Sequence, residues 1–231
     1  QGLCQVQVNA RIGWTFAAAM RTFLRADPDV IMIGEMRDSE TANIAIEASL
    51  TGHLVFSTLH TNSAAESIAR LLEIGLDPFN FSDSLLAVLA QRLVRRVCPS
   101  CGITAEATQT DLDVMLYEYL HSARDTSDSS REALLNTWRQ QYGDAQGRIH
   151  LRHRGPGCPT CNQRGYKGRI GIHELLVSDD AIRLHIRQRS SAMEILETSL
   201  KGGMRTLRQD GIDKVLQGHT DVKEVLAASN N

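Results

Sequence analysis

Residues 29–34 read Asp-Val-Ile-Met-Ile-Gly, and residues 53–60 read His-Leu-Val-Phe-Ser-Thr-Leu-His. Both runs are almost continuously apolar and rich in β-branched or aromatic residues, which is typical of strands. A continuous apolar run, unlike an alternating one, indicates that both faces of the strand are buried, as in a parallel sheet. These two runs therefore predict neighbouring strands at the centre of an α/β fold.

Helical patterns follow each of these strands. Residues 39–50 predict one helix, with Asp38 or Ser39 as its N-cap and Gly52 as its stop. A second helix opens with a capping box, Ser63-x-x-Glu66, and ends at Gly75. Strand, helix, strand and helix in this order predict a doubly wound α/β sheet.

The remaining chain is predicted to be mainly helical. Residues 79–97 are expected to form one amphipathic helix, whose apolar side would be Leu85, Leu86, Leu89, Leu93 and Val97. Residues 163–171, rich in Gly and Arg, are expected to be a connection with many turns. Further helices are expected at 110–121, 131–142, 179–189, 192–201, 205–217 and 222–228, the last one capped by Asp221.

Composition limits the classes of function. The chain has 231 residues, of which 42% are apolar and 23% charged, and its formal net charge is −2. This is ordinary globular composition, and the missing basic excess argues against a dedicated nucleic-acid binder. No apolar run approaches the ~20 residues that cross a bilayer, and no secretion leader is visible, so we expect a cytosolic protein. Residues 1–8 read as a strand already under way without an initiator Met, and we interpret the chain as a piece of a longer protein.

Four of the five cysteines form two pairs, Cys98-x-x-Cys101 and Cys158-x-x-Cys161. Each knuckle can direct two thiolates toward one point, and two knuckles complete a tetrahedral Cys₄ site without an open position for water. Paired motifs of this kind in a cytosolic chain favour a metal over disulfides. We therefore predict structural zinc, with a pair of redox dithiols or an iron–sulfur cluster as the alternatives.

Polar residues follow both predicted strands. Glu35 comes directly after the first, where nucleotide-hydrolysing α/β folds present a carboxylate to Mg²⁺ or to the attacking water. Thr58, His60 and Asn62 close the second, where a γ-phosphate would lie. Each feature alone has an ordinary explanation, since strands often end in an acidic residue at the solvent and His60 or Asn62 can simply cap the next helix.

Together, these stretches resemble one family. Residues 27–38 (DPDVIMIGEMRD) look like the Walker B region of the type II/IV secretion ATPases, and residues 51–62 (TGHLVFSTLHTN) resemble the His box of that family. Residues 89–98, 165–174 and 203–207 continue the match. The resemblance covers nearly the whole chain except about 103–156, and it includes both GspE-like type II secretion motors and PilB-like pilus-assembly motors.

The resemblance implies a RecA-like P-loop ATPase core, of which this chain would hold the second half. Members are homohexameric cytoplasmic ATPases, peripheral to the inner membrane, that use ATP and Mg²⁺ and contact platform and anchor proteins of the machine. By this analogy Glu35 is the Walker B glutamate, acting on Mg²⁺ or on the hydrolytic water. His53 and His60 are the His-box residues, and His60 is the better candidate for contact with the γ-phosphate.

Three arginines are further candidates for the nucleotide site. Arg21 and Arg25 are expected either to reach a phosphate or a neighbouring subunit, or to lie on a solvated helix face. Arg37 is expected either to act in the same way or to pair with a nearby acid in the same chain.

One departure from the family pattern is large. The chain contains no Gly-x-x-x-x-Gly-Lys-Ser/Thr, so the phosphate-cradling amides, the lysine and the Mg²⁺-binding hydroxyl are not in it. We predict that the chain alone neither binds ATP tightly nor hydrolyses it. The expected domains are 1–97, the second part of the ATPase core; 98–168, the zinc module with a helical insert; and 169–231, a helical subdomain.

Several functions remain open at this stage. The first hypothesis is a part of the ATP-hydrolysing motor of type II secretion, and the second is a pilus-assembly motor. A conjugation-type DNA-transfer motor is a third, which the tetracysteine module disfavours. The alternative from another class is a non-enzymatic, zinc-stabilised module for protein interaction.

Overall fold

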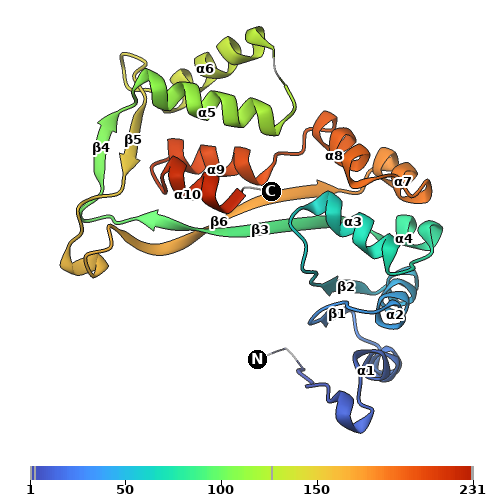
Figure 1. Cartoon of the computed structure of the whole chain (residues 1–231). Coiled ribbons are helices and arrows are strands. Elements are labelled where there is room, and N and C mark those ends of the chain that lie inside the picture. Colours follow the sequence, from blue (N-terminus) through green and yellow to red (C-terminus); the bar gives the residue numbers. More distant parts are fainter. Residues whose placement is uncertain (1, 3, 126, 230–231) are drawn as a thin grey trace. The chain divides into compact units, whose positions relative to one another are not determined.

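A computed structural model describes residues 2, 4–125 and 127–229 (Figure 1). The helices and strands, in chain order, are α1 (Phe16–Phe23), β1 (Val30–Ile33), α2 (Ser39–Leu50), β2 (Leu54–Ser57), α3 (Ala64–Glu73), α4 (Pro78–Ser84), β3 (Ala87–Val97), β4 (Ile103–Glu106), α5 (Gln109–Ser122), α6 (Asp128–Tyr142), β5 (His150–His153), β6 (Tyr166–Val177), α7 (Asp180–Arg187), α8 (Ala192–Lys201), α9 (Leu207–Leu216) and α10 (Val222–Ser229), with single 3₁₀ turns η1 (Ala10–Ile12), η2 (Leu24–Ala26) and η3 (Pro159–Cys161). The predicted α/β class is confirmed.

The chain divides into two compact units. The first unit comprises residues 1–88 and 176–201, and the second comprises residues 89–175 and 202–231. β3 and β6, which pair with each other, contribute residues to both units. The functional domain boundaries at residues 97 and 168 remain a prediction.

In the first unit, β1 and β2 form the predicted parallel pair. Val30 lies beside Leu54, and Ile33 lies beside Ser57. α1 and α2 pack together, and their apolar side chains form one core with alternate residues of the pair. The members of this core are Ala17, Met20, Ile31, Ile33, Ile44, Ala45 and Ala48. Asp38 caps α2 through its Oδ1, which accepts the N–H of Thr41 at 2.8 Å, as expected from the sequence.

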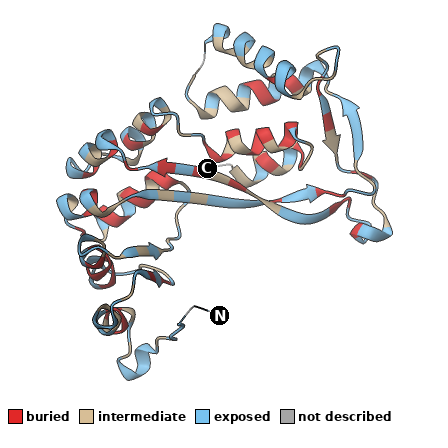
Figure 2. Ribbon diagram, turned by 180° about the vertical axis from the view of Figure 1, so that it is seen from behind, coloured by how far each residue is buried: buried red, intermediate tan, exposed pale blue. Residues whose placement is uncertain are grey.

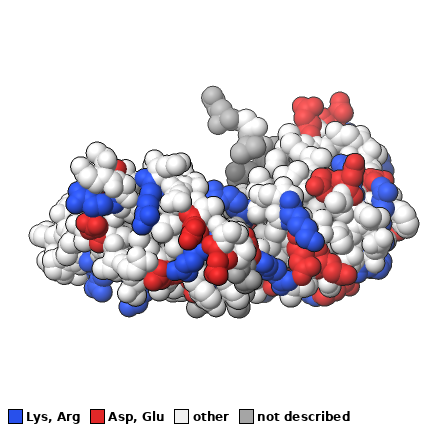
Figure 3. Space-filling view, turned by 90° about the horizontal axis from the view of Figure 1, so that it is seen from above, with Lys and Arg blue, Asp and Glu red and all other residues white. Residues whose placement is uncertain are grey.

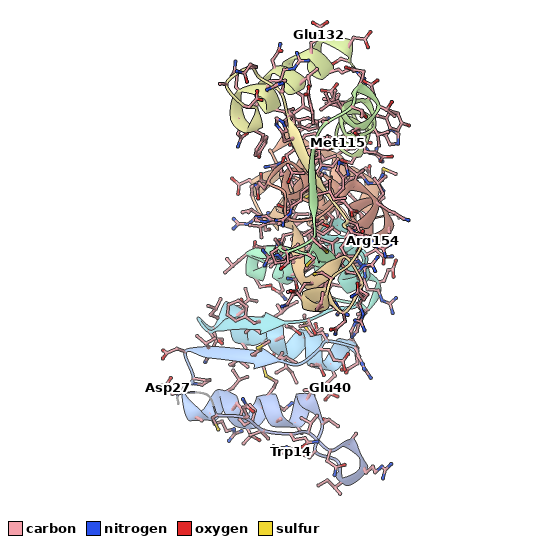
Figure 4. The ribbon with its side chains drawn as sticks, turned by 90° about the vertical axis from the view of Figure 1, so that its left-hand side faces the viewer. Trp14, Asp27, Glu40, Met115, Glu132 and Arg154 are labelled. Carbon is pink, nitrogen blue, oxygen red and sulfur yellow. The ribbon has the colours of Figure 1, made fainter. Side chains whose placement is uncertain are left out.

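The prediction that both faces of these strands are buried is wrong for the chain as described. Ile31 and Ile33 are buried, but Val30 is 55% and Met32 is 74% exposed. The reason is that α1 and α2 supply apolar cover to one face only, while the side chains that point the other way meet solvent. Figure 4 shows the β1–β2 pair above α1 in the lower part of the view.

Helices from both ends of the chain complete the first unit. α4 packs on α7, and α3 packs on α8. The guanidinium of Arg187 donates to Ser82 Oγ at 2.9 Å and to Asp83 Oδ1 at 2.6 Å, which ties α7 to α4. Arg189 donates to the carbonyl oxygens of Leu72 and Leu76, which end α3 and the turn after it.

The helix predicted over residues 79–97 is wrong. The structure has the short helix α4 and then the long strand β3, which pairs with β6. The leucines at 86, 89 and 93 have helical spacing, yet all three are more than half exposed, Leu86 just before the strand and the other two on it. Val88, Ala90 and Val94 instead follow a spacing of two or four and are the better covered side chains, which fits a strand. Figure 2 shows how much of these two strands is exposed.

The connection predicted over residues 163–171 is also partly wrong, because β6 begins at Tyr166. Ile172, Glu174 and Leu176 are buried at a spacing of two, a strand signal that the glycines obscured. The strand expected at residues 1–8 is likewise not seen at residues 2 and 4–8, while Gln1 and Leu3 lie outside the described residues.

In the second unit, β4 and β5 pair in antiparallel fashion and carry the helices α5 and α6 between them (Figure 1). This insert has a core of its own with α9 and α10, and α5 packs on α9. The core consists of Leu112, Met115, Leu116, Trp138, Ile149, Leu151, Ile212, Val215, Leu216 and Val225. The insert is therefore an integral part of the fold and holds the C-terminal helices.

Charged side chains are interspersed over the face seen in Figure 3. Most arginines whose contacts are defined face a carboxylate of the same unit, for example Arg95 with Glu224 and Arg131 with Asp113. This mixed pattern agrees with the net charge of −2 for the whole sequence.

Candidate functional site

The carboxyl ends of β1 and β2 form the first candidate site. Their register places Gly34 beside Thr58, one residue beyond the last ladder pair. Two hydrogen bonds then join the segments that leave the strands: the N–H of Met36 donates to the carbonyl of Thr58 at 3.2 Å, and the hydroxyl of Thr58 donates to the carbonyl of Gly34. These bonds fix the backbone on both sides of Glu35.

Glu35 is held between the side chains of Arg37 and His60. Its Oε1 lies 2.7 Å from Nη2 of Arg37, and its Oε2 lies 3.2 Å from Nε2 of His60. The hydrogen bond from Arg37, with a smaller contribution from His60, lowers the pKa of Glu35 below its ordinary value despite partial burial. Glu35 is therefore a carboxylate at neutral pH. The intrachain ion pair expected as one possibility for Arg37 is present.

One oxygen of Glu35 fits a hydrated metal ion. Oε2 is buried and accepts no well-aligned hydrogen bond from the described residues, although His60 lies near it. A carboxylate oxygen in this state is available to a water molecule bound to Mg²⁺. The hydroxyl of Ser57, at the end of β2, is also buried and lacks a partner within the described part of the chain. The sequence analysis missed Ser57, although its position one residue before Thr58 was the available signal.

The other residues predicted for a nucleotide site lie elsewhere. His53 precedes β2, at the opposite end of the strand from His60. Its Nδ1 lies 2.9 Å from the carbonyl oxygen of Ala48, at the end of α2. Arg21 pairs with Glu40 across α1 and α2 at 2.7 Å, and Arg25 is exposed in η2. The structure therefore groups Glu35, Arg37, Thr58 and His60 and leaves these three apart.

The four paired cysteines form the second candidate site. Their sulfur atoms all lie within 4.8 Å of one another. The Sγ···Sγ distance is 3.8 Å for Cys98 and Cys158, 3.8 Å for Cys101 and Cys161, and 3.7 Å for Cys158 and Cys161. Four sulfurs bound to zinc at about 2.3 Å in a tetrahedron lie about 3.8 Å apart. The cluster could therefore hold a zinc-sized ion with little rearrangement.

Backbone amides prepare this cluster for negative charge. The N–H groups of Cys158 and Gly165 donate to Sγ of Cys161 at 3.3 and 3.2 Å. Burial raises the pKa of Cys161, but these N–H groups outweigh it and lower the pKa to about 6. Burial, followed by the neighbouring Cys98 sulfur, raises the pKa of Cys101 to about 12. A divalent cation would lower the raised pKa of Cys101, because its positive charge neutralises the crowded thiolates.

Further residues that the sequence analysis missed support the cysteine cluster. Arg152 donates to the carbonyl oxygens of Cys98 and Pro99 at 3.1 and 2.7 Å and so clamps the first knuckle. A Cβ at Gly155 would lie 1.6 Å from the carbonyl oxygen of Cys101, so only glycine fits there. The N–H of Cys98 donates to the carbonyl of Gly165, which joins the two knuckles. Glycines and an arginine close to a metal-binding motif in the sequence are the signal by which these supporting residues could have been found.

The chain matches the sequence profile described as "Type II/IV secretion system protein" over residues 1–227. It belongs to the type II/IV secretion system protein family. The resemblance stated from the sequence is thereby confirmed, and the two sites described above are sites of a member of this family.

The relatives of this chain include both type IV pilus assembly and type II secretion proteins. The type IV pilus assembly ATPase PilB of Thermus thermophilus is 48% identical over 98% of the chain, which covers 23% of that protein. The type II secretion system ATPase E of Vibrio cholerae is 44% identical over 97% of the chain, which covers 39% of that protein. The type II secretion system protein HxcR of Pseudomonas aeruginosa is 42% identical over the whole chain. The chain thus spans about two fifths or less of the length of these relatives.

Solved structures of similar fold agree with this membership. The pilus retraction motor PilT with bound ADP superposes with a TM-score of 0.57 at 26% identity, over 94% of this chain and 44% of its own. The ATPase DotB of Legionella pneumophila shares the fold, with a TM-score of 0.58 at 21% identity, over 97% of this chain and 44% of its own. No helix in the described part of the chain is both long and apolar enough to cross a membrane.

The contact between Arg37 and Glu35 gives a prediction about pH. In Arg37→Ala, the carboxylate loses its main stabilising partner, so the pKa of Glu35 should rise toward its ordinary value and its titration should shift to higher pH. Carbon-detected NMR of the side-chain carboxyl measures this directly. Arg11→Ala removes an exposed arginine from η1 and serves as the matched control. An unchanged titration of Glu35 in Arg37→Ala would contradict the contact.

The cysteine geometry predicts one zinc ion per chain. Cys158→Ser should abolish stoichiometric zinc and lower the thermal unfolding temperature, because removal of one ligand leaves the other thiolates crowded without full compensation. Metal analysis after gel filtration, together with circular dichroism, measures both effects. Cys4→Ser changes the exposed fifth cysteine and should alter neither. Zinc should also leave the wild-type chain as the pH falls, since protons compete for the thiolates.

Proposed function

We propose that this chain is part of an ATP-hydrolysing motor that powers type II protein secretion by assembling a pseudopilus at the bacterial inner membrane. The observation that carries the proposal is the grouping of Glu35, Arg37 and His60 at the carboxyl ends of two parallel strands. The chain belongs to the type II/IV secretion system protein family. In α/β folds that bind nucleotides, the carboxyl edge of the parallel strands is where a carboxylate meets the nucleotide. A non-enzymatic module would have no need of a carboxylate kept ionised in this position.

Each residue of this edge has a distinct proposed role. Glu35 acts through Oε2, the oxygen near His60, either on a water of Mg²⁺ or on the water that attacks the γ-phosphate. His60, whose side chain is 84% exposed, reaches outward from Glu35 and contacts the γ-phosphate. Arg37 positions the carboxylate, and Thr58 fixes the backbone before it. His53, Arg21 and Arg25 are proposed to contact nucleotide or a neighbouring subunit only after rearrangement, since they lie apart from Glu35 here.

The active form is proposed to be the full-length protein. The present chain lacks the Gly-x-x-x-x-Gly-Lys-Ser/Thr motif that supplies the phosphate cradle, so it is not expected to hydrolyse ATP alone. By family membership, the full-length protein would be a cytoplasmic homohexamer. It would dock at the inner membrane on the platform and anchor proteins of the secretion machine.

Zinc is proposed to be structural. It would join Cys98 to Cys158 across 60 residues, and closing so long a loop without a metal costs conformational entropy. Between the two knuckles lie the helices α5 and α6, whose outer faces offer a surface to other components of the machine. This surface carries exposed side chains such as Val114 and Tyr117.

Type IV pilus assembly is the second candidate function, because the Thermus PilB relative is as similar to this chain as the type II relatives are. A pilus retraction motor is a weaker candidate despite the fold similarity to PilT, since the family resemblance links the tetracysteine module to the secretion and assembly branches.

ATP hydrolysis by the full-length gene product tests the proposal. With Mg²⁺, the intact protein should turn over ATP, and Glu35→Gln should lower kcat by about 10²-fold or more, because the neutral amide cannot stabilise the transition state in the same way. Glu73→Gln changes an exposed acid at the end of α3 and should leave kcat unchanged.

Two outcomes oppose the proposal. An intact hexamer with no ATPase activity would favour the non-enzymatic zinc module, and an unimpaired Glu35→Gln would separate this edge from the chemistry. In a strain that lacks the gene, loss of exoprotein secretion with pili retained would assign the motor to type II secretion. The reverse would assign it to pilus assembly.

A further inference from the structure

The second unit contains a cavity of about 300 Å³ that none of the assignments above uses. It lies beside the first cysteine knuckle, because Arg152 lines it and also holds Cys98 and Pro99. Side chains from several elements form its wall. The ones that matter below are Arg95 of β3, Arg152 of β5, Arg154 of the following loop, Tyr166 of β6, and Asp221 and Lys223 at the start of α10.

Two of the three arginines in this wall are positioned by neutral groups. Arg152 is fixed by two carbonyl oxygens, and Nε of Arg154 donates to the carbonyl oxygen of Arg164 at 3.0 Å. Among the residues that the structure describes, neither these two arginines nor Lys223 forms an ion pair with a carboxylate. The two guanidinium groups are therefore positioned by neutral acceptors, whereas Lys223 is attracted electrostatically to the adjacent Glu224. Arg154 is exposed and is labelled in Figure 4.

The two acidic side chains of the wall, Asp111 and Asp221, accept hydrogen bonds from uncharged donors. Asp221 Oδ2 accepts the hydroxyl of Tyr166 at 2.6 Å, and its Oδ1 accepts the N–H of Glu224 at 3.1 Å. Asp111 Oδ2 accepts both donors of Thr108 in the capping box of α5. Glu224 accepts the guanidinium of Arg95, so that one pair is internally neutral. Asp111 and Asp221 keep their negative charges, so the wall carries four cationic side chains, Arg95, Arg152, Arg154 and Lys223, against two carboxylates.

Tyr166 forms an apolar floor between two of the cations. The guanidinium carbon of Arg95 lies 4.3 Å from the centre of its ring, and that of Arg154 lies 5.8 Å from it. Burial and the bond to Asp221 raise the pKa of Tyr166, so its hydroxyl remains a donor to Asp221. This arrangement stiffens the wall, because both guanidinium groups rest on one fixed ring.

We propose that this cavity binds a phosphate group through Arg152, Arg154 and Lys223. Arg154 can offer both of its Nη groups to a phosphate, since its bond to Arg164 uses Nε. Arg152 can offer Nη1, because its Nη2 donates to the two carbonyl oxygens, and the ammonium of Lys223 adds a third point of contact. The cavity is large enough for a phosphate mono- or diester head but not for a whole nucleotide with ordered water around it. The phosphate could belong to a soluble molecule or to the head group of an anionic lipid, and both sources present the same chemistry to this wall.

Two binding measurements on the zinc-loaded chain distinguish these sources. Calorimetric titration with sodium pyrophosphate at low salt reports a soluble phosphate. Co-sedimentation with vesicles of phosphatidylglycerol and phosphatidylcholine, compared with vesicles of phosphatidylcholine alone, reports a lipid head group. Binding in either measurement should weaken as salt is added, because the attraction is electrostatic.

The variant for this test is Arg154→Gln with Lys223→Gln, which spares Arg152 and its clamp on the knuckle. Loss of two charged donors should weaken the affinity at least about tenfold. Arg139→Gln with Lys201→Gln removes the same charges from exposed positions on α6 and α8 and is the matched control. Zinc content should be unchanged in both, which shows that the fold is retained.

The outcomes separate clearly. A loss confined to the Arg154/Lys223 variant supports the proposal, and the measurement in which it occurs names the source of the phosphate. No binding of either probe to the wild-type chain overturns it. An equal loss in both double variants also overturns it, since the effect would then come from net charge and not from this cavity. None of these outcomes bears on ATP hydrolysis at Glu35.

Discussion

β1 and β2 pair in parallel, with Ile33 beside Ser57, and the position of every residue in the first site depends on this register. Parallel strands end at the same edge of a sheet, so the residues that leave β1 meet the residues that leave β2. A shift of one residue would move Thr58 away from Gly34 and reverse the faces of all the side chains that follow. The buried residues Ile31 and Ile33 hold the register by packing against α1 and α2.

The two units use different means to hold their parts together. The first is held by apolar packing around the strands, and by arginines of α7 and of the turn after it that bind α4 and the end of α3. The second unit relies on the insert, whose core includes α9 and α10. It also relies on the four cysteines, which bring together two knuckles 60 residues apart in the sequence. A zinc ion at these cysteines would stabilise the second unit directly, without any role in chemistry.

Much of the first site was predictable from sequence. The two strands, the helix after each and the caps at Asp38 and Ser63 follow from apolar periodicity and short-range hydrogen bonding, which are local properties. Glu35, Thr58 and His60 could be expected to meet for the same reason. Local patterns do not identify the ion-pair partner of a long side chain. The pairs Arg37–Glu35 and Arg21–Glu40 are therefore known only from the structure.

The two errors in secondary structure have a common physical cause. Leu86, Leu89 and Leu93 have helical spacing, but β3 is stabilised by its ladder with β6, more than 60 residues away in sequence, and that pairing overrides local propensity. The same long-range ladder explains the missed start of β6 at Tyr166. Burial of both faces of β1 was expected from its continuous apolar run, but such a run does not say which element supplies the cover.

A structure of the full-length protein with Mg²⁺ and a non-hydrolysable ATP analogue would test the central claim most directly. The account predicts a water molecule of the Mg²⁺ ion, or the water aligned with the γ-phosphate, within hydrogen-bonding distance of Glu35 Oε2, with His60 beside the terminal phosphate. A nucleotide whose terminal phosphate lies more than about 10 Å from Glu35, well beyond a bridging water, would contradict it.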